Sequence, residues 1–348
     1  MANQYEQFEQ RKQDHIKLSL MHENQTADLS KFDSIHLVHD ALPDLNFNEI
    51  NIAGIRFGQV VAKPFLVSSM TAGHRRAEHI NHHLVEACAQ SGWAMGVGSQ
   101  RRELMDPKAA FEWTHLRQSF PQVQLYSNLG IAQLINTPLT DIQRLTDALQ
   151  ANALIIHCNP LQECMQPEGT TDYKGCWQAL EQLVKQFPLP IIIKETGCGF
   201  SPKTMQRLTD IGIAALDIGG LGGTHWGRIE GHRATQDPIR HQAAITFKNW
   251  GIDTVTAVQQ AAALKPTFEI WGSGGVTNGL NAAKLFALGA STVGYAKPML
   301  EAALVSTEQV LLQMQTIEYE LKVAMFCTGS RVLGDLTKKL AERSNLEL

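Results

Sequence analysis

The sequence lacks the features that mark membrane, secreted and nucleic-acid-binding proteins. No stretch approaches the roughly 18 consecutive apolar residues of a membrane span, and the first residues contain no apolar signal core. The six cysteines include no Cys-x-x-Cys pair, and 30 basic against 34 acidic residues leave a formal net charge of -4. Such a balance offers no electrostatic surface for nucleic acid or a membrane. We therefore expect a reduced, cytoplasmic protein whose partner is a small molecule.

Short apolar segments alternate with segments of helical period through most of the chain. The segments expected to form buried strands are 65–68, 94–97, 123–126, 153–157, 191–194, 214–218, 268–271 and 292–295. Strict alternation of strands and helices predicts right-handed βαβ units and a parallel sheet. Eight such units over roughly 230 residues favour an α/β fold of the (β/α)8 TIM-barrel type over an open doubly wound sheet.

The rest of the chain is expected to flank this barrel, so that residues 1–348 form one domain. Residues 1–62 would form an N-terminal arm and a capping hairpin, 63–300 the barrel, and 301–348 the C-terminal helices. Within the first part, the apolar spacing over 32–45 predicts a short amphipathic element, and 50–61 predicts the hairpin. The connection of about 50 residues between strands six and seven is long enough to cover the active face.

The stretch 152–163 joins a buried strand to a cluster of polar residues. Its apolar run breaks into His157, Asn159, Gln162 and Glu163. Pro160 cannot donate a hydrogen bond to a sheet, so we expect the backbone to leave the barrel there and carry the last two side chains on a loop. The alternative is an ordinary polar turn after a core strand.

Polar or glycine residues follow every expected strand, at the end where parallel barrels carry catalytic groups. After the seventh strand, Gly274 and Gly275 allow close approach of the backbone to a ligand, and Thr277 adds a hydroxyl. The helix expected from residue 279 would point its positive end at an anion. The pattern predicts a phosphate-binding turn.

Lys194, the last residue of the fifth expected strand, suggests which phosphate compound is bound. A lysine beside the pyrimidine edge of a flavin would stabilise an anionic reduced ring, so lysine and phosphate turn together favour flavin mononucleotide, FMN. The alternative is a structural ion pair between Lys194 and Glu195 or Asp217. 

Glu163 is the candidate metal ligand, because Mg²⁺ often takes one carboxylate and completes its shell with water and substrate phosphate. A transition-metal site is not expected on the helix that carries neighbouring histidines without matching cysteines or carboxylates. These histidines are His79, His82 and His83. Cys158 and Cys164 lack zinc spacing, and a thiol nucleophile is a minor alternative because no dedicated base is evident.

These residues together resemble the type 2 isopentenyl-diphosphate isomerases, an FMN-dependent family. The Asn-Pro-Leu-Gln-Glu element is the most specific part, since other FMN barrels share the phosphate turn and the lysine but not that loop. The match covers nearly the whole chain and consists of Arg11-Lys12-x-x-His15, Ser69-Met70-Thr71-Ala72-Gly73, Ser99-Gln100-Arg101, Asn128, His157-x-Asn159-Pro160-Leu161-Gln162-Glu163, Lys194-Glu195, Gly222-Gly223-Thr224, Ser273-Gly274-Gly275 and Ala296.

The resemblance implies a role for each matching position. The residues around FMN would be Ser69, Met70, Thr71, Ser99, Asn128, Lys194, Thr224, Gly275, Val276, Thr277, Ala296 and Lys297. The residues that hold the substrate would be Arg11, Lys12, Ser99, Gln100, Arg101 and Gln162. Catalysis would involve Gln162, His157 and Lys194, and Glu163 would bind Mg²⁺ against a diphosphate. The chain departs from the family pattern at Gln13, His225 and Thr277, which bears on local cofactor contacts.

The activity implied is the interconversion of isopentenyl and dimethylallyl diphosphate by a 1,3-proton shift, with reduced FMN as acid-base catalyst. NADPH would bring FMN to its active state, although no second nucleotide motif distinguishes it from NADH. Related barrels assemble as tetramers or octamers, so a homo-oligomer is expected. The main alternative is an FMN-dependent oxidoreductase of a small hydroxy acid, with a histidine base and an arginine carboxylate clamp. A non-catalytic barrel that binds a phosphorylated ligand is the third possibility.

Overall fold

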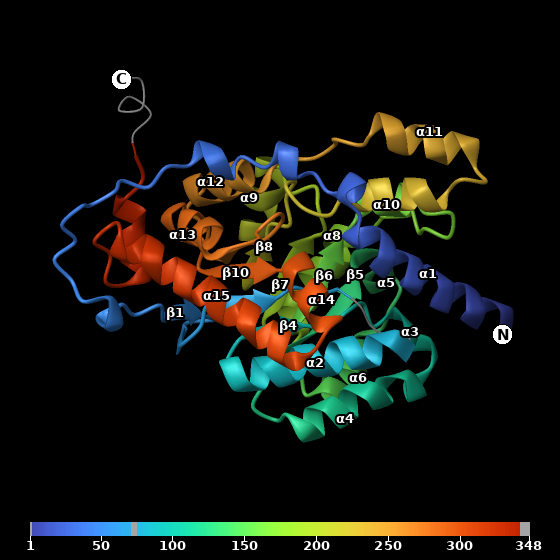
Figure 1. Cartoon of the computed structure of the whole chain (residues 1–348). Helices are drawn as coiled ribbons and strands as arrows, with labels where there is room; N and C mark the ends of the chain where they lie inside the picture. The colour runs from blue at the N-terminus through green and yellow to red at the C-terminus, as the bar shows by residue number, and fades with distance from the viewer. Residues whose placement is uncertain (1, 71–74, 342–348) are drawn as a thin grey trace.

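The computed structural model describes residues 2–70 and 75–341. Parallel strands surrounded by helices (Figure 1) close into a barrel in the order β10-β3-β4-β5-β6-β7-β8-β9, which confirms the expected (β/α)8 fold. The strands are β3 (Phe65–Val67), β4 (Ala94–Gly96), β5 (Leu125–Gly130), β6 (Ala153–Cys158), β7 (Ile191–Glu195), β8 (Ala215–Asp217), β9 (Glu269–Gly272) and β10 (Thr292–Tyr295).

Helices surround this barrel and supply its outer core. They are α2 (Arg75–Ser91), α3 (Arg101–Met105), α4 (Phe111–Ser119), α5 (Ile131–Leu134), α6 (Leu139–Leu149), α7 (Pro160–Met165), α8 (Cys176–Gln186), α9 (Pro202–Ile211), α12 (Thr254–Ala263) and α13 (Gly279–Ala287). The buried apolar residues of strands and helices form one large cluster between the two layers. No helix within the described residues has the length and apolar character needed to cross a membrane.

Strand β5 begins and ends later than the sequence pattern indicated, since 123–126 was expected and Leu125–Gly130 is observed. Ser127 and Asn128 therefore lie inside the strand, not beyond it. They remain there because both side chains are satisfied locally. Ser127 Oγ donates to Gln100 Oε1, and Asn128 Nδ2 donates to the Val97 carbonyl at 3.0 Å.

A hairpin seals the N-terminal end of the barrel, as expected. Strands β1 (Gly54–Arg56) and β2 (Gln59–Val61) pair antiparallel. Phe57 at their turn packs on Tyr126 and Trp271, with ring centroids 6.1 and 5.6 Å away. These rings join a separate apolar cluster formed by strand residues inside the barrel. The N-terminal end is therefore packed with side chains.

The expected amphipathic element over 32–45 is not formed. Only a 3-10 turn, Phe32–Ser34, is present there, and Val38 and Leu42 are 51% and 86% exposed. The segment instead runs beside the C-terminal part of the chain, where the Val38 N–H donates to the Lys339 carbonyl at 2.8 Å. The backbone of this segment therefore forms hydrogen bonds to a distant part of the chain, not the local bonds of the amphipathic element that the apolar spacing predicted.

Additional helices lie at the C-terminal end of the strands and along one side. Helix α1 (Ala2–Leu20) contacts α10 (Trp226–Arg233), and α11 (Pro238–Thr246) follows α10 within the long connection between β8 and β9. In Figure 1, α1 and the hairpin strand β1 lie on opposite sides of the barrel. Helices α14 (Lys297–Ala303) and α15 (Thr307–Phe326) form the expected C-terminal pair, and α15 packs on α2 and α13.

Candidate functional site

A cavity of about 360 Å³ opens at the C-terminal ends of the strands, and residues of α1 line part of it. Ligand sites of this size and position are typical of TIM-barrel enzymes. Most residues singled out from the sequence meet on its wall. They are Arg11, Lys12, Ser69, Met70, Ser99, Arg101, Asn128, His157, Gln162, Glu163, Lys194, Thr224, Gly275, Val276, Thr277, Ala296 and Lys297.

Two candidate residues are not placed on this wall. Thr71 lies outside the described residues. Gln100 is 1% exposed, and its Oε1 accepts hydrogen bonds from Ser127 Oγ and, at 3.2 Å, from the Asn128 N–H. The Gln100 side chain thus supports the strand that carries Asn128.

The glycine turn after β9 is shaped by close contact with a second glycine turn. Gly274 and Gly275 have φ of 102° and 73°, values that L side chains rarely adopt. A Cβ added to Gly275 would lie 2.3 Å from the Gly222 carbonyl oxygen. Thr254 Oγ1 donates to the Gly274 carbonyl at 2.8 Å. These contacts leave room only for bare backbone at this part of the wall.

The helix end expected to face a phosphate is partly capped by the protein. The Gly279 N–H donates to Glu320 Oε2 at 2.6 Å, and the Asn281 N–H donates to Asn278 Oδ1 at 2.8 Å. Two of the four amide groups that begin α13 therefore have side-chain acceptors. Any phosphate at this turn would be held mainly by the glycine backbone.

Lys194 is both ion-paired and part of the cavity wall. Its Nζ lies 2.8 Å from Asp217 Oδ2 and 3.3 Å from Ser273 Oγ, and Ser273 Oγ donates to the other oxygen of Asp217. Lys194 and Asp217 are only 7% and 1% exposed. The partner is Asp217 and not Glu195, which accepts the Gly197 N–H at 2.7 Å. The pair places a fixed, buried cation beside the cavity.

His157 presents a neutral imidazole to the same space. Its Nδ1 lies 2.8 Å from Asn128 Oδ1, whose amide nitrogen is engaged with Val97, so we assign the proton to Nδ1 and leave Nε2 as an acceptor. Burial, helped by the charges of Lys12 and Lys194, lowers the pKa of His157 to about 4. The ring is therefore uncharged near neutral pH.

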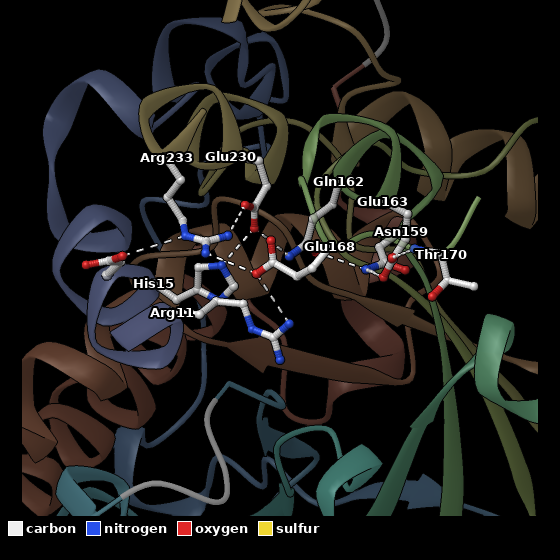
Figure 2. A network of polar contacts seen from close by, with 10 residues as sticks. Arg11, His15, Asn159, Gln162, Glu163, Glu168, Thr170, Glu230 and Arg233 are labelled. Carbon is white, nitrogen blue, oxygen red and sulfur yellow. Dashed lines mark hydrogen bonds and ion pairs between the residues drawn. The ribbon is translucent and has the colours of Figure 1, made fainter. Parts of the chain in front are cut away.

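Gln162 and Glu163 lie on a short helix, not on the expected loop. Pro160 is the first residue of α7, where its missing N–H costs no hydrogen bond. Asn159 Nδ2 donates to Gln162 Oε1 at 3.0 Å and to Glu163 Oε1 at 3.1 Å, and the Thr170 N–H donates to Glu163 Oε2 at 2.6 Å (Figure 2). Both side chains are held in one orientation before any ligand arrives.

Glu230 on α10, which the sequence patterns did not single out, connects this helix to α1. Figure 2 shows its carboxylate between His15, Arg233 and Gln162. Glu230 Oε1 lies 2.7 Å from His15 Nε2 and 3.2 Å from Gln162 Nε2, and Oε2 lies 2.5 Å from Arg233 Nη1. In the sequence, Glu230 could have been noticed only because it shares one face of α10 with Trp226 and Arg233.

The protonation states in this network are set by burial and by the hydrogen bonds. Burial alone would raise the pKa of Glu230, but the bonds from His15 and Arg233 outweigh it and lower that pKa. Burial lowers the pKa of His15 despite its bond to Glu230. Glu230 is therefore a carboxylate that accepts the Nε2–H of a neutral His15.

Helix α1 is held over the cavity by charged groups. Arg11 Nη1 lies 3.5 Å from Glu168, which also binds Arg233 at 3.0 Å, and Arg233 Nε lies 3.7 Å from Asp14. Burial, together with the charges of Arg11 and Arg101, lowers the pKa of Lys12 to about 8. The cavity thus carries a strongly cationic wall.

Two of the departures from the family pattern lie away from the cavity. His225 is fully buried and caps α10, where its Nδ1 accepts the Arg228 N–H at 3.2 Å. Gln13 is exposed, and neither residue is among those that line the cavity. Only Thr277 of the three departures lines it.

The other candidate metal and thiol groups have structural surroundings. No three His, Cys, Asp or Glu side chains among the described residues are arranged to hold a metal ion. His83 Nδ1 donates to the Ala303 carbonyl at 2.8 Å. Burial raises the pKa of Cys158 well above its usual value, which keeps this thiol protonated and unreactive.

The FMN-dependent dehydrogenase family matches residues 131–343 of the chain. Two solved structures share the fold of this chain. One is a mandelate oxidase with (S)-2-phenylpropionate (TM-score 0.63, 18% identity, 93% of this chain and 89% of the other). The other is a mutant flavocytochrome b2 with pyruvate bound (TM-score 0.69, 16% identity, 95% of this chain and 82% of the other). The fold and the site therefore define an FMN-dependent barrel protein.

Much higher identity relates the chain to one branch of these proteins. It is 68% identical to the isopentenyl-diphosphate delta-isomerase of Legionella pneumophila (strain Corby), over 97% of this chain and 99% of the relative. It is 50% identical to that of Bdellovibrio bacteriovorus, over 96% and 97%. The chain belongs to the isopentenyl-diphosphate delta-isomerase family.

Proposed function

We propose that this protein interconverts isopentenyl diphosphate and dimethylallyl diphosphate. A proton is added to the terminal alkene carbon and another is removed from C2, so the double bond moves and there is no net redox change. One observation carries the proposal: a cationic wall from Arg11, Lys12 and Arg101 faces the same cavity as the glycine turn and Lys194. A diphosphate and a flavin phosphate could both be neutralised there.

The residues present fit FMN. Within residues 2–70 and 75–341, the buried hydroxyls of Ser68 and Ser69 have no hydrogen-bond partner although both line the cavity. Buried polar groups are rarely left unsatisfied, and flavin oxygens and nitrogens would satisfy them. When bound, reduced FMN supplies acid-base chemistry at the N5 region of its ring. The glycine turn at 274–275 would hold the phosphate, and Lys194 would lie along the ring.

The surroundings of Glu163 fit a Mg²⁺ ion whose remaining ligands come from the substrate. It is 7% exposed and lines the cavity. Its Oε1 and Oε2 each accept one hydrogen bond, so each keeps a lone pair for a metal ion. Mg²⁺ commonly binds through one or two carboxylates plus substrate phosphates. We infer that Glu163 and the diphosphate would share the ion.

The chain's own part in catalysis is to orient groups and to exclude water. Gln162 has its amide oxygen bound to Asn159 and its amide nitrogen bound to Glu230, so it cannot turn. The Glu230 carboxylate would favour positive charge that develops in the substrate near Gln162. His157, neutral with a bare Nε2, offers a weak acceptor that does not compete for protons. Helix α1, held through Arg11, His15 and Asp14, would keep water from a carbocation-like species.

The alternative activity, oxidation of a small hydroxy acid, rests on the fold alone. It requires a histidine that takes a proton near neutral pH. Burial lowers the pKa of His157 to about 4, and His15 is engaged with Glu230. Neither of these two histidines therefore has the surroundings that the base of an oxidoreductase needs.

Three further assignments complete the proposal. NADPH would reduce FMN to its active state. The protein would assemble as a tetramer or octamer, which sedimentation velocity can measure. We also propose that the protein functions in the reducing cytoplasm, because its six cysteines are all free.

Anaerobic flavin spectra separate the two activities. FMN-loaded protein mixed with lactate or mandelate should keep the spectrum of oxidised flavin, whereas a hydroxy-acid oxidoreductase would lose it within seconds. Protein reduced by NADPH and supplied with Mg²⁺ should convert isopentenyl diphosphate while the reduced spectrum persists. Bleaching by a hydroxy acid without any isomerisation would contradict the proposal.

A further inference from the structure

The segment that follows α1 is hydrogen-bonded to the glycine turn after β8. Residues 24–26 run antiparallel to residues 223–225 and form an isolated bridge with them. In this pairing the Thr26 N–H donates to the Gly223 carbonyl at 2.8 Å. Helix α1 ends at Leu20, only a few residues earlier. The N-terminal helix is therefore anchored at a turn that belongs to the barrel.

The side chain of Thr26 holds the same turn a second time. Its Oγ1 accepts the Gly222 N–H at 2.9 Å and donates to the Gly223 carbonyl at 3.0 Å. Thr26 is 1% exposed, and it is not among the described residues that line the cavity. The hydroxyl thus fixes two consecutive residues of the 222–223 turn without lining the cavity itself.

The 222–223 turn lies directly against the 274–275 turn, for which we infer phosphate binding. A Cβ added to Gly275 would lie 2.3 Å from the Gly222 carbonyl oxygen, and one added to Gly223 would lie 2.6 Å from the Gly275 nitrogen. All three glycines line the cavity. Contacts as close as these leave no slack, so a shift of the 222–223 turn has to move the 274–275 turn. Backbone N–H groups bind a phosphate only when they converge on it.

We propose that Thr26 is a positioning residue for the phosphate of FMN: its hydroxyl holds the 222–223 turn in the place that fixes the 274–275 turn. The segment that carries α1 thereby takes part in cofactor binding as well as in covering the cavity. The inference rests on the proposed function, in which FMN occupies this site.

The test compares Thr26→Val with Thr146→Val. Valine keeps the shape of threonine but can neither donate nor accept a hydrogen bond, so the buried Gly222 N–H would lose its acceptor. Thr146 on α6 is also 1% exposed; its hydroxyl donates to the Gln143 carbonyl at 2.9 Å, and it does not line the cavity. Fluorescence titration of the flavin-free full chain would measure FMN affinity. The affinity should fall about 10-fold in Thr26→Val, as the loss of one or two hydrogen bonds predicts, and stay within about twofold of the wild type in Thr146→Val.

Riboflavin separates an effect on the phosphate from a general disturbance of the site, because it carries the same ring without the phosphate. Its affinity should change less than about twofold in Thr26→Val. In a Gly275→Ala background, Thr26→Val should lower FMN affinity by less than about 3-fold, since the turn that it supports is already displaced.

Two further variants at the same position guard against a folding defect. Thr26→Ser keeps the hydroxyl and should recover most of the FMN affinity. Thr26→Ala removes the hydroxyl without adding a methyl group in its place, and it should lose as much FMN affinity as Thr26→Val.

Unchanged FMN affinity in both Thr26→Val and Thr26→Ala, or an equal loss of affinity for riboflavin and FMN, would overturn the role of Thr26. A full 10-fold loss that persists in the Gly275→Ala background would do the same. Protein that shows all the expected effects on FMN but does not convert isopentenyl diphosphate would overturn the proposed function instead. The two failures are therefore distinguishable.

Discussion

The two ends of the barrel are built from the same strands but follow opposite rules. At the N-terminal end, Phe57 covers Tyr126 and Trp271, and Arg56 donates to Gln124 Oε1 and to the carbonyls of Lys63 and Phe65. At the C-terminal end, buried charges, bare glycine backbone and unsatisfied hydroxyls surround a cavity. Side chains fill the N-terminal end of the barrel, whereas the C-terminal end keeps a cavity that can hold a ligand. Substitutions at the two ends should accordingly separate stability from activity.

The largest effect is expected for Lys194→Ala at the open end. Turnover should fall by at least about 100-fold, because a buried cation beside the flavin site is lost. Asp217 would be left unpaired, so unfolding should also become easier by about 3–5 kcal/mol. Assays at matched flavin content and urea titration would measure the two losses. Adding Asp217→Asn should restore stability and leave turnover low, and unchanged turnover by Lys194→Ala would count heavily against the mechanism.

Gly275→Ala should come next, with Gly58→Ala in the hairpin turn as its matched control. Both glycines have positive φ, 73° and 72°, but a Cβ at Gly58 would meet nothing within 4 Å, whereas at Gly275 it would overlap the Gly222 backbone. Gly58→Ala should cost only about 1–2 kcal/mol of stability and leave FMN binding unchanged.

FMN affinity, measured by fluorescence titration of the flavin-free protein, should fall about 100-fold in Gly275→Ala, since this is the turn expected to approach the phosphate. Equal flavin affinity in the two glycine variants would show that the 274–275 turn does not contact the cofactor.

Arg56→Ala, at the N-terminal end of the barrel, should lower stability and leave activity nearly unchanged. Three hydrogen bonds to Gln124, Lys63 and Phe65 would be lost from a residue that is 3% exposed. At about 1 kcal/mol each, the unfolding free energy should drop by about 3 kcal/mol. Urea titration measures this drop. Turnover at 20 °C should stay within about twofold of the wild type, and a tenfold loss would mean that the two ends are coupled.

The last prediction concerns stability in acid and leaves stability near neutral pH unchanged. Unfolded His157 takes up a proton near pH 6.5, whereas the folded residue resists protonation until about pH 4. The unfolded chain therefore binds more protons in this window, and stability should fall as the pH drops through it. In His157→Gln this contribution should disappear, so the unfolding free energy should vary less between pH 6.5 and 4. Identical pH dependence in both proteins would contradict the neutral state of His157.

The sequence predicted the barrel well because apolar runs and helical periods are local signals. Every expected strand is present, and β10 has the expected bounds. Strand β5 was misplaced because Ser127 and Asn128 read as strand-ending residues, although bonds to Gln100 and Val97 satisfy them within the sheet. Pro160 was ambiguous, since proline suits a loop and also the first turn of a helix.

Contacts in the site between residues far apart in the sequence could not be predicted from local sequence patterns. Gln162 meets Glu230 across 68 positions, and His15 meets the same carboxylate across 215. His15 entered only through its place in a motif, and Glu230 lay in a connection whose helices have no strand pattern to anchor them. Cavity residues that follow strands were found from sequence, because the barrel brings all strand ends to one side.

Proton NMR of isopentenyl diphosphate, incubated without oxygen with the protein, FMN, Mg²⁺ and NADPH, tests the central proposal most directly. A parallel sample would contain oxidised FMN alone. Dimethylallyl diphosphate should form only with reduced flavin, and NADPH should not be consumed in proportion to product. Flavin-loaded protein that forms no dimethylallyl diphosphate under these conditions would contradict the isomerase assignment and leave only the FMN-dependent barrel standing.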